Sequence, residues 1–321
     1  MLFQAASRTI LKAIILINSD LQHNKTWAPT GQFASAPKVP PVASTVLAGV
    51  LRAVPMLLVF MGIVGSGSGL AQTPAVEGTA ARPFEIIDNS FLIEEAFNQE
   101  GGIFQNIATF THNRDGTWAS SFTQEWPLGG QTHQFSYVFT YLGAELGSGI
   151  GDTLLNYRFQ AMTESASRPA FSPRISFVVP TADETRGLGN VSAGVQFNLP
   201  FSKQFGDVYL HWNAGITHVP RARSLSVTTA LTTPTLGASA IWRAKPMLNL
   251  MIETVAEFEE AIDGSATTRT TTVTFSPGLR GGWNIGNKQV IVGAAVPVTL
   301  DSGRSSAAIL GYFSYELPFS Q

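Results

Sequence analysis

Alternation of apolar and polar residues, in segments of about ten residues separated by turn residues, constrains the fold of this sequence more than any other feature. The segment 248–259 (LNLMIETVAEFE) is a clear example, because its apolar and small residues occupy every second position from Leu248. A helix would place Leu248 and Leu250 on nearly opposite sides, whereas a strand places them on one face. The alternation therefore predicts β-strands with one apolar and one polar face.

We predict twelve such strands. They lie at 103–112, 117–126, 133–144, 151–162, 170–180, 189–199, 206–217, 234–243, 247–260, 269–282, 288–298 and 307–319. Ten residues at about 3.3 Å each, tilted by about 40°, rise roughly 25 Å, the height of the apolar band of an outer-membrane barrel. The predicted fold class is all-β, a closed antiparallel transmembrane β-barrel of about twelve strands.

A soluble β-sandwich or jelly roll is the alternative, because its strands also alternate with period two. Charged residues make up 13% of the chain, about half the share of roughly 25% in globular proteins. Low charge without excess apolar content favours the barrel, in which lipid-facing and polar positions alternate.

Residues 52–71 (RAVPMLLVFMGIVGSGSGLA) have the layout of a signal peptide. Arg52 precedes an apolar core at 53–64, and the small residues after it predict cleavage after Ala71. The apolar core is too short for a transmembrane helix, which needs roughly 20 residues and is the alternative. Because signal peptides rarely begin so far into a chain, we hypothesise that translation starts near Val50, and that residues 1–49 are wrongly assigned or disordered.

The predicted organisation has three parts. Residues 1–71 are an N-terminal extension plus signal peptide, and 103–321 are the outer-membrane barrel. Residues 72–102 are a short periplasmic segment, in which 89–100 (NSFLIEEAFNQE) would form a helical turn before the barrel or plug its periplasmic mouth.

An even number of strands places both mature termini in the periplasm of a bacterial outer-membrane barrel. Even-numbered connections are then short periplasmic turns, for which 202–206, 245–246 and 284–287 are candidates. Odd-numbered connections are longer and extracellular, for which 181–188, 219–233 and 263–268 are candidates.

Partners follow from the same architecture. They are outer-membrane lipid, lipopolysaccharide and the barrel-assembly machinery. The aromatic-ended final strand 307–319 resembles the signal that this machinery reads.

Charged residues on the polar strand faces are the candidate lumen-lining set. They are Arg158, Arg174, His211, Glu253, Glu257, Glu259, Arg280 and Glu316. Facing a lumen, they would filter solutes as charged rings do in pores. Alternatively they pair across strands and only hold the interior together.

The sequence argues against several classes of function. The formal net charge of −2 leaves no basic footprint for nucleic acid. The chain has no cysteine, which excludes disulfides and thiolate metal sites. None of its histidines has a serine two residues on, as in lipid-hydrolysing barrels, and no G-x-S-x-G occurs. We therefore expect no enzyme activity, cofactor or metal.

Three stretches carry a family resemblance: 91–99 (FLIEEAFNQ), 149–159 (GIGDTLLNYRF) and 173–190 (PRISFVVPTADETRGLGN). Together they resemble the outer-membrane proteins of the meta-pathway of phenol degradation, over residues 90–319. The resemblance implies a channel or uptake barrel for small, aromatic or hydrophobic solutes. The alternative is a closed structural or adhesive barrel without transport, displaying the Thr/Ser-rich stretch 222–233 as an outer loop.

Overall fold

The computed structural model describes residues 86–319, apart from 190, 191, 225, 226, 264, 265 and 287. These residues form one antiparallel sheet that closes on itself. The first strand, β1 (Ile103–Asn113), pairs with the last, β15 (Arg304–Pro318), from Ile103↔Pro318 to Asn113↔Ala308. The predicted signal peptide, the cleavage after Ala71 and the hypothesis on residues 1–49 lie outside the described residues.

Fifteen strands supply twelve barrel strands, because three barrel strands are each interrupted once. The uninterrupted ones, besides β1 and β15, are β2 (Trp118–Pro127), β3 (His133–Ala144), β8 (Gly194–Phe205), β9 (Val208–Ser224), β10 (Val227–Lys245), β11 (Leu248–Asp263) and β12 (Ala266–Ile285). The interrupted ones are β4 (Gly147–Ile150) with β5 (Thr153–Phe159), β6 (Ala170–Phe171) with β7 (Arg174–Val179), and β13 (Lys288–Ala295) with β14 (Val298–Asp301). The predicted closed antiparallel barrel of about twelve strands is therefore confirmed.

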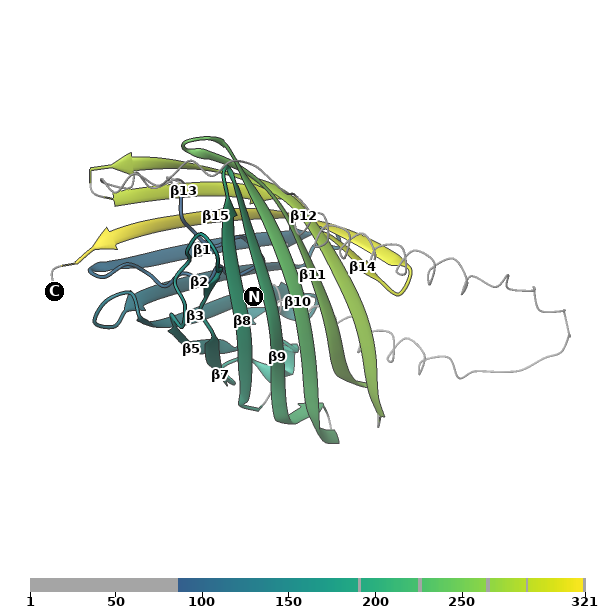
Figure 1. Cartoon of the computed structure of the whole chain (residues 1–321). Helices are drawn as coiled ribbons and strands as arrows, with labels where there is room; N and C mark the ends of the chain where they lie inside the picture. The colour runs from purple at the N-terminus through teal and green to yellow at the C-terminus, as the bar shows by residue number, and fades with distance from the viewer. Residues whose placement is uncertain (1–85, 190–191, 225–226, 264–265, 287, 320–321) are drawn as a thin grey trace, which may run out of the picture. The chain divides into compact units, whose positions relative to one another are not determined.

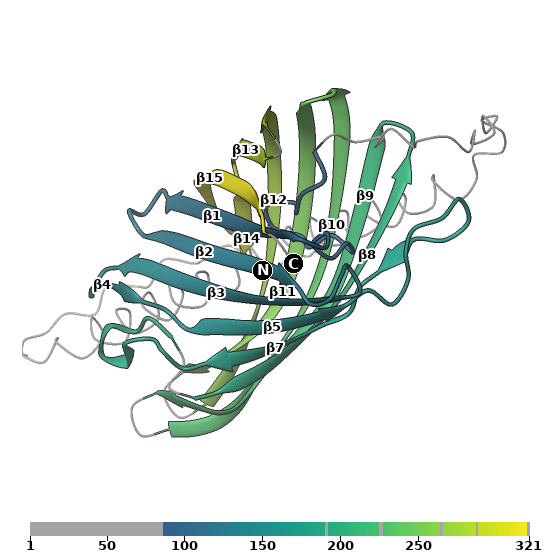
Figure 2. The ribbon, with the colours of Figure 1, turned by 90° about the vertical axis from the view of Figure 1, so that its left-hand side faces the viewer.

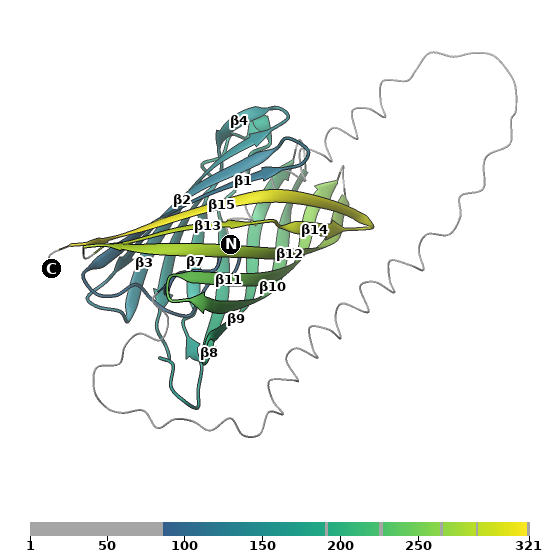
Figure 3. The ribbon, with the colours of Figure 1, turned by 90° about the horizontal axis from the view of Figure 1, so that it is seen from above.

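Two of the interruptions fall at prolines. Pro173 separates β6 from β7, and Pro297 separates β13 from β14. Proline has no backbone N–H to donate to a ladder, so it breaks the hydrogen bonding of a central strand. In Figure 3, β14 continues the line of β13 between β12 and β15, and both parts pair with both neighbours.

The strands β9, β10 and β12 are much longer than predicted, with 17, 19 and 20 residues, and β11 with 16 is slightly longer; the four form one wall in Figure 1. The predicted connections 219–233 and 263–268 each contain a junction between strands, but they are much shorter than predicted. The predicted outer loop at 222–233 is wrong, because most of it belongs to β9 and β10. Both stretches contain threonines, and β-branched residues such as threonine favour extended backbone. The prediction of a connection at 181–188 is confirmed, within residues 180–193, where η1 (Glu184–Arg186) is one 3-10 turn.

The opposite wall, seen in Figure 2, contains β1, β2, β3, β5 and β7. The boundary predicted for the strand at 189–199 is wrong, because β8 begins at Gly194 and runs through the predicted turn 202–206 to Phe205. The other two predicted short turns are confirmed to within two residues, because β10 ends at Lys245 and β11 begins at Leu248, and β12 ends at Ile285 and β13 begins at Lys288.

The two faces of the sheet have opposite character. On β7, Ile175 and Phe177 are exposed outside while Arg174 and Ser176 are buried inside. Polar residues inside and apolar residues outside reverse the pattern of a soluble protein and match a transmembrane barrel. Among the described residues, no helix is long and apolar enough to span a bilayer.

Residues 86–102, hereafter the internal segment, lie inside the barrel and contain bends but no helix. The predicted helical turn at 89–100 is therefore wrong. Ile86, Phe91, Leu92 and Ile93 pack against inward-facing wall residues in the main apolar cluster. The backbone N–H groups that a helix would use bond instead to wall side chains, so tertiary contacts override the local helical tendency.

Candidate channel interior

The internal segment begins against strands β1, β12 and β15. The Asp88 carboxylate accepts hydrogen bonds from Gln105 Nε2 at 2.8 Å and from Ser314 Oγ at 2.6 Å. Arg280 Nη1 donates to the carbonyl oxygens of Asp88 and Asn89, at 2.9 and 2.7 Å. The first residues of the segment are thus held by three strands at the end of the barrel where β1 begins.

Glu253 of β11 makes the most concentrated contact with the segment. Its carboxylate accepts from the backbone N–H groups of Leu92 at 2.8 Å, Ile93 at 3.2 Å and Phe91 at 3.3 Å. The Glu253 side chain is 1% exposed. Three N–H donors compensate for much of the cost of burying a carboxylate.

The middle of the segment crosses β9 and β8. Asn213 accepts from the backbone N–H of Glu94 and donates to its carbonyl oxygen, both at 2.8 Å. Ser202 Oγ accepts from the N–H of Ala96 at 2.7 Å and also lies 2.7 Å from His211 Nδ1. Ser202 and His211 are both fully buried behind the segment, so the pair positions backbone and is closed to a substrate.

Arg158 of β5 holds the end of the segment. Its Nε donates to Asn98 Oδ1 at 2.9 Å, and its two terminal nitrogens donate to the carbonyl oxygens of Glu95 and Phe97. The amide side chain of Gln134 on β3 accepts from the N–H of Gln99 at 2.6 Å. A guanidinium suits this place because it offers five donors in a fixed plane.

Glycines in the wall accept the apolar side chains of the segment. A Cβ atom at Gly293 would lie 2.3 Å from the Phe91 ring, and one at Gly237 would lie 2.2 Å from Ile93 Cδ1. Gly278 and Gly282 likewise leave room for Phe91 and Ile86. Glycine inside a strand often marks such a close approach.

The structure places the predicted lumen-lining residues in three regions of the barrel. Arg158, Arg174, His211, Glu253 and Arg280 are buried around the internal segment. Glu257 and Glu259 are buried on the inner face of β11 nearer its other end, and Glu316 is half-buried near the end of β15.

Sequence reasoning missed the neutral residues that hold the segment, chiefly Asn213, Gln134 and Ser202. These residues alternate like every other polar position, and nothing in the sequence separates them from the rest. The strand glycines gave a usable signal, because Gly237, Gly278, Gly282 and Gly293 all interrupt predicted strands with positions that lack a side chain to pack.

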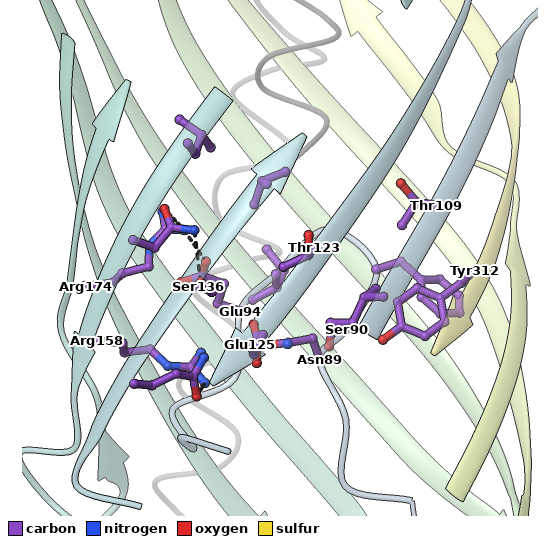
Figure 4. Close-up of a pocket in the computed structure, with 17 residues that line it drawn as sticks. Asn89, Ser90, Glu94, Thr109, Thr123, Glu125, Ser136, Arg158, Arg174 and Tyr312 are labelled. Atoms are coloured by element: carbon purple, nitrogen blue, oxygen red, sulfur yellow. Dashed lines mark hydrogen bonds and ion pairs between the residues drawn. The ribbon is translucent and has the colours of Figure 1, made fainter. Parts of the chain in front are cut away.

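A cavity lies between the internal segment and the inner face of β1, β2, β3, β5 and β7. Figure 4 shows Arg158 and Arg174 on one side and Tyr312 on the other, with Glu94 and Glu125 between them. Phe91, Ile107, Val138 and Leu154 contribute apolar lining. The cavity therefore combines charged groups with apolar surface.

The glutamates of the segment experience different surroundings. Burial raises the pKa of the Glu94 carboxyl, but the guanidinium groups of Arg174 and Arg158 outweigh burial and lower it. Arg174 Nη1 lies 2.8 Å from Glu94 Oε1. Burial, followed by the nearby Asp88 carboxylate, raises the pKa of Glu95 to about 8. Among the described residues, no group of three acidic, histidine or cysteine side chains has the geometry of a metal site.

Comparisons with known proteins agree with this architecture. No protein-family model matches the chain, and no curated protein matches it. Among solved structures, the chain is similar to an outer membrane channel from Pseudomonas putida F1, with a TM-score of 0.53 and 14% identity over 73% of this chain and 100% of that one. It is less similar to the translocator domain of the autotransporter NalP from Neisseria meningitidis, with a TM-score of 0.39 and 10% identity over 69% of this chain and 90% of that one. The fold is thus that of a bacterial outer-membrane β-barrel.

Proposed function

We propose that the protein is an outer-membrane channel or uptake barrel for small, aromatic or hydrophobic solutes. One observation carries the proposal: the internal segment occupies the interior without adding a strand to the sheet. Side-chain hydrogen bonds and glycine contacts hold it, and the barrel is closed by β1 and β15 alone. The segment can therefore move aside without opening the wall.

Membership in the family of the meta-pathway of phenol degradation is part of the proposal. The three stretches that resemble the family meet inside the barrel. Glu94 of the first pairs with Arg174 of the third, and Asn98 of the first accepts from Arg158 of the second. The three stretches are far apart in the sequence but contact one another in the barrel, which supports treating them as the motifs of one family.

Single-channel conductance in planar bilayers tests the proposal. Ser90 Oγ lies 2.9 Å from Ser239 Oγ, and the chain contains no cysteine, so Ser90→Cys with Ser239→Cys can join segment and wall by a single disulfide. We expect a variant lacking residues 86–99 to conduct strongly. The oxidised double variant should stay closed and regain wild-type behaviour with reductant, and a folded deletion variant that conducts no current or solute would contradict the proposal.

A closed structural barrel is the second candidate function. The dense bonding of the segment favours it, since Asp88, Glu253 and Arg158 each make several contacts with it or with its neighbours. In that case the wild type and the oxidised double variant would have the same negligible flux under every condition, and only the deletion would conduct.

The proposed location is the bacterial outer membrane with both ends of the sheet in the periplasm. Ile103, at the start of the first strand, pairs with Pro318, at the end of the last, so the chain enters and leaves the sheet at the same end of the barrel. A cysteine at Asp207, in the turn between β8 and β9, should resist a membrane-impermeant maleimide in intact cells, whereas one at Asp115 should react. The reverse labelling pattern would invert the orientation. Recognition of strand 307–319 by the assembly machinery, and contact with lipopolysaccharide, remain predictions.

A further inference from the structure

The inner face of β7 carries three different side chains in line. From the internal segment toward the far end of the barrel they are the Arg174 guanidinium, the Ser176 hydroxyl and the Val178 isopropyl group. Alternate residues of a strand share a face and lie about 6.6 Å apart. The three groups therefore form a short gradient from cationic through polar to apolar.

Two of these groups have unused hydrogen-bonding capacity. Arg174 is 6% exposed and Ser176 is 1% exposed, yet Arg174 Nε and Ser176 Oγ have no hydrogen-bond partner among the residues that the structure describes. Buried polar groups are nearly always paired, so each exception requires an explanation. Both groups are donors, and both lie on the same strand face, so one acceptor-bearing molecule could satisfy them.

The apolar end of the gradient is wider than one residue. Val178 packs with Leu154 and Val138 in a separate apolar cluster on the neighbouring strands. Leu154, Val138 and Arg174 also line the cavity next to the segment. A ligand with an apolar body and an oxyanion head would match both ends.

Glu94 of the internal segment already places a carboxylate on Arg174. The Nη1–Oε1 distance is 2.8 Å, and the other terminal nitrogen donates to Gln196 Oε1 at 2.7 Å. The segment thus presents to Arg174 the same group that a carboxylate ligand would present.

We propose that this face of β7 binds small carboxylates with an apolar body, and that they compete with Glu94 for Arg174 and so loosen the internal segment. The inference rests on the proposed channel function and names the chemical class of its solute. A solute that binds Arg174 would therefore release Glu94, and with it the internal segment that obstructs the barrel.

Benzoate and its neutral analogue benzamide provide the test, with acetate as the carboxylate that lacks an apolar body. Binding to the purified, folded barrel is measured by calorimetry at constant ionic strength. We expect benzoate to bind about tenfold tighter than benzamide, the difference expected for one charge-assisted hydrogen bond. Benzoate should also bind tighter than acetate.

Variants assign the preference to this face. Arg174→Gln should abolish the distinction between benzoate and benzamide, and Ser176→Ala should weaken benzoate binding without affecting folding, because the hydroxyl has no partner to lose. Val178→Thr should reduce the preference for benzoate over acetate. Arg243→Gln is the matched control, because Arg243 pairs with Asp207 in the exposed turn region.

Competition is tested with Glu94→Gln, which should bind benzoate more tightly than the wild type. Equal binding of benzoate and benzamide, an unchanged preference in both Arg174→Gln and Ser176→Ala, or weaker benzoate binding in Glu94→Gln would each overturn the inference. Calorimetry needs no current, so a barrel that binds benzoate but never conducts refutes the channel alone. A conducting barrel without carboxylate preference refutes only this inference.

Discussion

The two halves of the barrel interior are built differently. In the half where β1 begins, Arg158, Glu253 and Arg280 are buried against the internal segment, and their partners are mostly backbone groups. In the other half, the inner face carries buried threonines on β9, β10 and β12, such as Thr217, Thr233 and Thr272. Glu257 and Glu259 are also buried in this second half, but the buried arginines all lie in the first, where a backbone without regular pairing needs donors.

The walls differ in the same way. The threonine-rich half contains the ends of the long strands β9 to β12, and β11 pairs with β12 over its whole length. Its backbone groups are satisfied by regular ladders, so its side chains need only fill space and form local hydrogen bonds. The comparison predicts that charged residues in the first half control the internal segment and that threonines in the second do not.

A common measurement sharpens the comparison. The Ser90→Cys variant places the sole cysteine of the chain on the segment, at a position that is 4% exposed. Its rate of maleimide labelling in the folded barrel reports how often the segment leaves the wall. Heat-modifiable gel mobility checks separately that the barrel itself stays folded.

The largest effect is expected from Glu253→Ala. The substitution leaves the N–H groups of Phe91, Leu92 and Ile93 without their acceptor, at about 1–3 kcal/mol for each buried donor. Labelling at position 90 should accelerate by more than a hundredfold while the barrel stays closed. An unchanged rate in folded protein would show that the carboxylate does not hold the segment.

A smaller effect is expected from pH through Glu95. Its pKa is raised from an ordinary 4.5 to about 8 when the segment is seated, so seating favours the protonated form. Seating should therefore weaken as pH rises from about 4.5 to about 8, by up to about 1.4 kcal/mol per pH unit, and become constant above that. Glu95→Gln should remove this dependence, after labelling rates are corrected with a cysteine on the surface. A dependence that survives Glu95→Gln would point to another group.

Gly293→Ala should have the next largest effect. The new Cβ would lie 2.3 Å from the Phe91 ring, and overpacking of this kind costs about 1–3 kcal/mol. Gly311→Ala on β15 is the matched control, because a Cβ there meets nothing closer than 3.9 Å. We expect faster labelling in the first variant only, and equal rates in the two would refute the steric contact.

The smallest effect is expected in the threonine half. Thr274 Oγ1 and Thr299 Oγ1 lie 2.8 Å apart, and Thr274→Val removes that hydrogen bond. The barrel should lose about 1 kcal/mol of stability against denaturant. The labelling rate at position 90 should not change, and a marked increase would mean that the two halves are coupled.

The alternation of apolar and polar residues predicted the architecture well, because the side chains that face lipid in a membrane barrel are apolar and those that face the interior are polar. Leu250 and Ile252 are exposed and Glu253 is buried, as the pattern in 248–259 indicated. Arg158, Arg174 and Arg280, which the same pattern puts on the polar strand faces, are likewise buried. Strand ends were less predictable, because threonine serves both strands and loops, and this led to the errors at 219–233 and 263–268.

The conformation of the internal segment could not be predicted from the residues of the segment alone. Its residues 89–100 have a helical tendency that is overridden by contacts with strands distant in the sequence, such as Glu253 and Asn213. No local pattern states that a glutamate on β11 will accept three N–H groups from residues 91–93. Only the strand glycines indicated that another part of the chain packs closely against the inner face of the sheet.

The wall and the internal segment are complementary in shape at these glycines, because each glycine leaves the space that a side chain of the segment fills. Changes at such matched positions should suppress one another: the loss caused by Gly293→Ala should be relieved by Phe91→Leu, which frees the space that the ring occupied. In homologous barrels we therefore expect a larger residue at the position of Gly293 to occur together with a smaller one at the position of Phe91. The combined side-chain volume of the two positions would then stay constant.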